Sequence, residues 1–227
     1  MQLKMSRCLI VFVFFSSFST SNAQQMEDLG RTKPFLIGLK GTIYNFIFPK
    51  TKSGAGIAQK VGYTPEIEKT EPIGFVYTQS LNISERNLKV PFPGVPLGKN
   101  VFAIIYTGHF EVQDSTEYAF GLKSDDGSRL WIDSTEVINN DGIHQFNVAK
   151  TGTIGLSKGF HSLKVWYFQG LADRMGLLLV MKKSTDSIFR AFDLKHEEEK
   201  AKKALNTEGG DSTTLHTKAN NKEKHFK

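Results

Sequence analysis

The stretch Ser124-Asp125-Asp126-Gly127-Ser128-Arg129-Leu130 decides which fold the sequence predicts. It contains Asp-Gly, one of the strongest short-range signals for a β-hairpin, because glycine adopts positive φ without steric cost. On both sides of it, apolar residues recur at every second position, which is the period of a β-strand. The stretch therefore predicts a hairpin whose first strand ends at Lys123 and whose second begins at Arg129.

The same period of two continues in short segments from Phe35 to Lys183. Predicted strands cover residues 35–46, 73–78, 102–107, 118–123, 129–133, 135–138, 151–156, 161–168 and 176–182. Gly, Asp, Asn or Pro stands between most of them, and many short strands separated by turns are typical of sandwiches and barrels. The 18 Phe and two Trp residues favour a well-filled core. We therefore predict an all-β protein built as an antiparallel β-sandwich.

The N-terminal residues 1–23 have the pattern of a secretory signal peptide. Lys4 and Arg7 precede an apolar run from Cys8 to Phe15, and Ser21-Asn22-Ala23 supplies small residues for cleavage. The run is shorter than the roughly 20 residues of a membrane-spanning helix, so we expect no integral membrane segment after cleavage. Cleavage would also remove Cys8, the single cysteine, and with it any disulfide or thiolate metal site. We expect an exported protein of the periplasm, the cell envelope or the medium.

The rest of the chain divides by composition. We expect residues 24–34 to be a linker and residues 35–184 to be one β-sandwich domain. Residues 185–195 fit either a last strand or a short helix. Residues 196–227 are charged and polar, and we expect a disordered tail because they bury too little apolar surface to offset the entropy of ordering.

Charge and motifs exclude several function classes. Loss of Lys4 and Arg7 with the predicted signal peptide would lower the formal net charge from +6 to +4, and no basic stripe with interleaved aromatics indicates nucleic-acid binding. His109, His144 and His161 lack the i, i+2 or i, i+4 spacing that brings zinc ligands together, so we expect no zinc site among them. No nucleophile elbow or pair of glutamates stands out. We predict no catalytic residues and no enzymatic activity.

The adjacent carboxylates of Asp125 and Asp126 need a physical explanation of their own. Neighbouring carboxylates repel each other unless one is protonated, both are well solvated, or a cation lies between them. Hard oxygen ligands suit Ca²⁺, which takes six to eight oxygens, so backbone carbonyls and a second loop would have to contribute. Two alternatives stay open from the residues alone: an acidic surface turn and a calcium site.

Beyond these patterns, five blocks of the sequence resemble the PA14 family, in the order that the family has them. The resemblance covers about residues 35–184. The blocks are Phe102-Ala-Ile-Ile-Tyr-Thr-Gly108, Tyr118-Ala-Phe-Gly-Leu-Lys-Ser-Asp-Asp-Gly-Ser-Arg-Leu-Trp-Ile-Asp133, Val137-Ile-Asn-Asn-Asp-Gly-Ile-His144, Gly159-Phe-His161 and Tyr167-Phe-Gln-Gly170. The resemblance implies a β-sandwich of jelly-roll type, in which the block residues His144 and His161 hydrogen-bond loops to the sandwich. In the family's lectins an Asp-Asp pair joined by a cis peptide binds Ca²⁺, which in turn holds sugar hydroxyls, and Asp125 and Asp126 match that pair.

Those lectins complete the calcium site from a second loop, commonly with an Asn. The matching loop here, residues 169–175, contains no Asn. Asp173 would replace it as a metal ligand, or Gln169 would supply an amide oxygen. We expect Gln169, Arg174 and Trp131 to contact the sugar, although the dominance of large aromatics in sandwich interiors favours a core position for Trp131.

Together these observations predict an exported, calcium-dependent carbohydrate-binding module. Its partner would be a glycan or polysaccharide at the cell envelope or outside the cell. The alternative is a structural, adhesion or protein-interaction domain that binds neither sugar nor metal and meets a cell-envelope protein.

Overall fold

The computed structural model of the 227-residue chain describes residues 29–45, 65–87, 95, 101–170 and 174–207. The predicted signal peptide, residues 24–28 of the predicted linker and residues 208–227 of the predicted tail lie outside these residues. Among the described residues, no helix combines the length and apolar character needed to cross a membrane.

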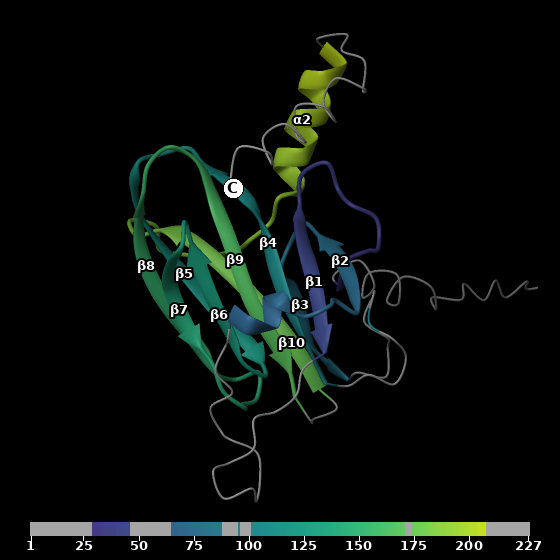
Figure 1. Cartoon of the computed structure of the whole chain (residues 1–227). Helices are drawn as coiled ribbons and strands as arrows, with labels where there is room; N and C mark the ends of the chain where they lie inside the picture. Colours follow the sequence, from purple (N-terminus) through teal and green to yellow (C-terminus); the bar gives the residue numbers. More distant parts are fainter. Residues whose placement is uncertain (1–28, 46–64, 88–94, 96–100, 171–173, 208–227) are drawn as a thin grey trace, which may run out of the picture.

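The fold is an antiparallel β-sandwich of two sheets, which confirms the predicted all-β class (Figure 1). One sheet has the order β2-β1-β4-β9-β6-β7, and the other has the order β11-β10-β5-β8 with β3 also paired to β10. The strands are β1 (Leu39–Asn45), β2 (Gly74–Thr78), β3 (Asn82–Asn87), β4 (Phe102–Val112), β5 (Thr116–Asp125), β6 (Ser128–Ile132), β7 (Thr135–Asn140), β8 (Ala149–Leu156), β9 (Gly159–Gln169), β10 (Arg174–Lys183) and β11 (Arg190–Ala191). Two helices accompany them, η1 (Pro65–Lys69) and α2 (Lys195–Thr207).

The main core lies between the two sheets. Alternate residues of each strand point inward, as the period of two requires, so that Ile104 and Tyr106 of β4 lie within it. Phe110 of β4 meets Phe120 of β5 edge-on, with ring centroids 6.1 Å apart, and this contact joins the two sheets. Aromatic pairs in this geometry add stability beyond the area that they bury.

A smaller apolar cluster covers part of the outer face of the six-stranded sheet. Its buried members are Tyr44, Ala103, Ile105, Trp166 and Phe168. Ile67 of η1 packs against this cluster, which places η1 over the outer face of the sheet (Figure 1). Trp166 is only 1% exposed and is therefore a core residue of this outer cluster.

The predicted hairpin at residues 124–130 is wrong. β5 belongs to the five-stranded sheet and β6 to the six-stranded sheet, so the chain crosses from one layer to the other between Asp125 and Ser128. Gly127 does not adopt positive φ. It is required for space instead, because a Cβ there would lie 2.8 Å from the nitrogen and 2.9 Å from the oxygen of Gly142. The Asp-Gly signal thus marks a close approach at a crossing between layers.

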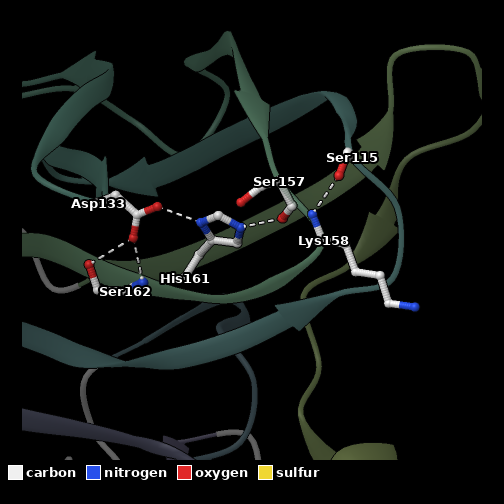
Figure 2. A network of polar contacts seen from close by, with 6 residues as sticks. All are labelled: Ser115, Asp133, Ser157, Lys158, His161 and Ser162. Carbon is white, nitrogen blue, oxygen red and sulfur yellow. Dashed lines mark hydrogen bonds and ion pairs between the residues drawn. The ribbon is translucent and has the colours of Figure 1, made fainter.

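The tight hairpin turn lies one strand further along, at Asp133-Ser134 between β6 and β7. Both residues have positive φ, 46° and 70°, as a type I′ turn requires. The Asp133 carboxylate accepts hydrogen bonds from the backbone and hydroxyl of Ser162 and contacts the imidazole of His161, whose Nε2 lies 2.7 Å from the carbonyl oxygen of Ser157 (Figure 2). His161 therefore ties loops to the sandwich, as predicted.

Both ends of the described chain are more ordered than predicted. Within the expected linker 24–34, Leu29 is 1% exposed and Arg31 exchanges two backbone hydrogen bonds with Tyr77. The expected disordered tail 196–227 is wrong for residues 196–207, which lie in α2, a helix that extends from one end of the sandwich (Figure 1). Polar contacts anchor this helix, because Glu198 is buried against Gln79 and pairs with Lys202 one turn later.

Candidate functional site

The crossing between β5 and β6 places two carboxylates side by side. Asp125 is the last residue of β5, Asp126 follows it, and the peptide bond between them is cis, as the resemblance implies for lectin members. Asp125 is 4% exposed and Asp126 is 3% exposed. The pair is therefore not a well-solvated acidic surface turn, and that alternative from the sequence is excluded.

Backbone donors from two other segments hold the Asp126 carboxylate. The amide of Gly170, just after β9, donates to Oδ2 at 2.7 Å, and the amide of His144 donates to Oδ1 at 3.2 Å. Each oxygen keeps a further lone pair, since a carboxylate offers about four acceptor sites. Asp126 is thus oriented by the protein and still able to bind a ligand.

The backbone of Asp125 is fixed from the core. The Tyr167 hydroxyl shares its single proton between the carbonyl oxygen of Asp125, 2.7 Å away, and Oε1 of Gln169, 2.6 Å away. Beside them, the hydroxyls of Ser124 and Ser128 lie 2.6 Å apart, and the Asn140 amide donates to Ser124. These buried hydrogen bonds hold the two sheets together at the point where the chain crosses between them.

Both aspartate side chains face a pocket of about 530 Å³. The other residues that line it are Glu85, Ile143, His144, Gln145 and Arg174. Arg174 pairs with Glu85 at 2.8 Å across the rim. A pocket of this size lies within the range of small-molecule sites, and a few convergent polar groups in such a pocket fix the orientation of a ligand.

The two carboxylates resist ionising together. Burial raises the pKa of Asp125, and the neighbouring charges of Asp126 and Glu85 raise it further, to about 6. Burial also raises the pKa of Asp126, although the amides of Gly170 and His144 oppose the shift. A cation bound beside the two carboxylates would lower both pKa values, because an opposite charge nearby favours the ionised form.

The structure assembles only part of the predicted ligand set. Asp125, Asp126 and Arg174 line the same pocket. Gln169 is fully buried beside it, where its amide donates to the Arg174 carbonyl and its oxygen accepts from Tyr167. Trp131 lies elsewhere, half-buried on the outer face of the six-stranded sheet. Asp173 lies outside the described residues.

Sequence reasoning missed four contributors to this site. Glu85 comes from a segment that belongs to no family block and was not predicted to be a strand. His144 belongs to a family block, but the contact of its amide with Asp126 was not predicted. Tyr167 and Gly170 were visible only as members of a family block. The signal available in the sequence was the block order, which keeps Tyr167 and Gly170 with the Asp-Asp pair.

The carboxylates of Asp125 and Asp126 are oxygen donors of the kind that Ca²⁺ takes. Within the described ranges, no three His, Cys, Asp or Glu side chains gather in a way that could hold a metal ion. A calcium ion beside this pair would therefore need further oxygens, which backbone carbonyls, amide side chains or a bound ligand can supply.

Comparison with known proteins identifies the fold. A family model described as the PA14 domain matches residues 93–186. A PA14 sugar-binding domain from an RTX adhesin superposes with a TM-score of 0.52 at 16% identity, covering 69% of this chain and 94% of that one. The PA14 domain of the MpAFP antifreeze protein gives 0.55 at 12% identity, covering 69% and 87%. At these identities the likeness shows the fold alone. A search of curated proteins found no match.

Proposed function

Residues 93–186 of this chain belong to the PA14 domain family, and from that premise we propose that the protein is a calcium-dependent, carbohydrate-binding module. The observation that carries the proposal is the adjacent pair Asp125 and Asp126, nearly buried yet facing a pocket of about 530 Å³. One solved domain with this fold is described as sugar-binding, which is consistent with the proposal.

The polar residues of the pocket have different roles in this proposal. Asp125 and Asp126 hold the calcium ion, which supplies positive charge and open coordination positions for sugar hydroxyls. The amides of Gly170 and His144 fix the Asp126 carboxylate before any ligand arrives, so little ordering entropy is lost on binding. Glu85, Gln145 and Arg174 supply hydrogen-bonding groups at the rim.

The role is one of binding, and its setting is outside the cytoplasm. The proposed export follows from the signal peptide predicted for residues 1–23. The neighbouring PA14 domains are described as parts of an adhesin and an antifreeze protein, which favours a binding module over an enzyme.

Thermal unfolding with and without calcium tests the metal. We expect calcium to raise the Tm of the wild type and of Asp186→Asn, an exposed carboxylate after β10, but not of Asp126→Asn. A wild-type Tm that calcium leaves unchanged would remove the metal from the proposal. A glycan array probed in calcium and in EDTA, with the wild type and with Asp126→Asn, then tests the sugar. If no glycan needs both calcium and Asp126 for binding, that half of the proposal is overturned.

A further inference from the structure

A second groove lies on the outer face of the six-stranded sheet. Its volume is about 590 Å³, within the range of ligand sites. It opens near the start of β1 and passes over the middle of β4 and β9 to β6. Lys164, in this groove, stands five residues before Gln169 on β9, roughly 17 Å away along the strand. The groove is therefore separate from the Asp125–Asp126 pocket.

One cross-strand row forms the floor of this groove. Lys40, Thr107, Lys164 and Trp131 are register partners on the adjacent strands β1, β4, β9 and β6. Their neighbours along each strand are buried in the main core, so these four side chains point to the outer face. Neighbouring strands lie about 4.8 Å apart, which puts the two lysines about 10 Å apart across Thr107.

The groove combines aromatic surface with positive charge. Trp131 is half-buried, and the ammonium of Lys164 lies 4.8 Å from its ring centroid. Lys40 lies 4.7 Å from the ring centroid of Phe75, and no carboxylate in the described part of the chain pairs with it. Hydroxyls of Thr107, Ser134 and Ser162 and the imidazole of His109 complete the polar lining.

Three carboxylates lie near the groove. That of Asp133 is held by His161 and by Ser162, whose hydroxyl lines the groove. Glu68 of η1 lies 3.3 Å from the Lys164 ammonium, but both side chains are more than 30% exposed. Exposed ion pairs of this kind contribute about 0–1 kcal/mol, so an anionic ligand can compete for Lys164. Glu136, the register partner of Trp131 on β7, pairs with Arg129 at 2.6 Å, and the Arg129 guanidinium lies 5.2 Å from the centroid of the Trp131 ring.

From these contacts we infer that the groove binds an acidic sugar chain, whose carboxylate or sulfate groups meet Lys40 and Lys164 while a sugar ring packs against Trp131. An aromatic side chain offers apolar area at low entropy cost, and ammonium-to-carboxylate hydrogen bonds are charge-assisted. The hydroxyls of Thr107, Ser134 and Ser162 can hydrogen-bond the remaining hydroxyls of the sugar. This site needs no calcium and does not rest on the function proposed for Asp125 and Asp126.

Titration of the full chain in EDTA at low salt tests the groove. The probes are oligogalacturonate, a sulfated chondroitin oligosaccharide and carboxyl-reduced oligogalacturonate as the neutral control. We expect binding of at least one acidic probe, a change in tryptophan fluorescence that reports on half-buried Trp131 because Trp166 is buried, and loss of binding in 0.5 M salt. No binding of either acidic probe would overturn the inference, as would equal binding of the neutral probe.

Matched variants locate the binding. Lys40→Gln and Lys164→Gln should each weaken it about tenfold, which corresponds to about 1.4 kcal/mol, and Trp131→Ala should abolish the fluorescence change. The control is Lys182→Gln, because Lys182 also lies over an aromatic ring, that of Phe189, but on the other sheet. A control variant that loses as much affinity as Lys40→Gln contradicts the site. Unchanged binding in Asp126→Asn separates this site from the calcium pocket, and loss there contradicts it.

Discussion

The imidazole of His161 on β9 contacts the carboxylate of Asp133, and this contact fastens the β6–β7 turn to the strand beside it (Figure 2). Burial alone would lower the pKa of His161, but the hydrogen bonds to Asp133 and the Ser157 carbonyl outweigh it and raise the pKa. Burial would raise the pKa of Asp133, yet His161 and Ser162 outweigh it and lower that pKa. Both shifts mean that the contact stabilises the charged forms of His161 and Asp133.

We expect this contact to make stability depend on pH. A raised histidine pKa contributes stability that is complete below about pH 6.5 and is lost as pH rises through the folded pKa. A lowered aspartate pKa contributes stability that is present above about pH 3.8 and is lost as pH falls through the folded pKa. Asp133→Asn should therefore reduce the free energy of unfolding by about 1 kcal/mol near pH 5.5 and by much less at pH 9. Asparagine tolerates positive φ, so the turn is kept.

Chemical denaturation at the two pH values measures this difference. Asp114→Asn is the matched control, because Asp114 pairs with Lys183, whose charge persists at both pH values. A deficit of Asp133→Asn that is equal at pH 5.5 and pH 9 would contradict the assignment to His161.

Two buried tyrosines should respond differently to loss of their hydroxyls. Tyr167→Phe removes the donor to the Asp125 carbonyl and to Gln169, and we expect it to cost about 1–3 kcal/mol of unfolding free energy because buried acceptors lose their partner. Tyr106 is equally buried, but its hydroxyl has no hydrogen-bond partner among the described residues. Tyr106→Phe should be neutral or stabilising. Equal losses in urea unfolding would show that the Tyr167 hydrogen bonds add nothing.

The crossing between the sheets should depend on one glycine. Gly127→Ala would place a methyl group against the backbone of Gly142 and the ring of Phe168. We expect the free energy of unfolding to fall by about 3 kcal/mol, because the backbone of Gly142 cannot move aside without disturbing the crossing. Gly155→Ala on β8 is the control, since nothing lies within 4 Å of the added carbon. Its Tm should stay close to that of the wild type. If both variants unfold at the same temperature, the crossing is not tightly packed.

Acid should weaken calcium binding at the proposed site. Because the folded pKa of Asp125 is about 6, a proton occupies this carboxylate as pH falls below 6. Calcium affinity measured by calorimetry should drop about tenfold from pH 7.5 to pH 5, since metal binding requires the deprotonated ligand. Affinity that is constant over this range would show that Asp125 is not a ligand.

The same carboxylate should destabilise the protein when calcium is absent. A raised aspartate pKa contributes stability that is complete below about 3.8 and is lost as pH rises through about 6. In EDTA at pH 7, Asp125→Asn should therefore have a higher Tm than the wild type, and the gap should close near pH 4. A lower Tm for Asp125→Asn at pH 7 would contradict burial of the charge.

Alternation along the strands was enough to predict the sandwich, but not where its turns lie. The Asp-Gly dipeptide indicates positive φ, whereas Gly127 is selected for space, which depends on the distant Gly142. Asp133-Ser134 forms the tight turn without a glycine, so its local signal is weak. β3 was missed because its sequence is polar and its pairing covers only half of β10.

The candidate site was predicted in part, for similar reasons. Asp125 and Asp126 were visible because two adjacent carboxylates demand an explanation, and the family blocks strengthened that interpretation. Glu85 reaches the pocket through the pairing of β3 with β10, which local sequence does not reveal. α2 was missed because its low hydrophobicity excludes a core helix but not one anchored by a buried Glu198.

The crossing at Asp125 and Asp126 also determines how the domain would carry mechanical load. Asp126 is bonded to Gly170 after β9 and to His144 after β7, while Asp125 continues directly from β5 of the other sheet. Tension applied through a ligand held there would enter both layers at once. The load would then be shared between β5 of one sheet and the segments that follow β7 and β9 of the other.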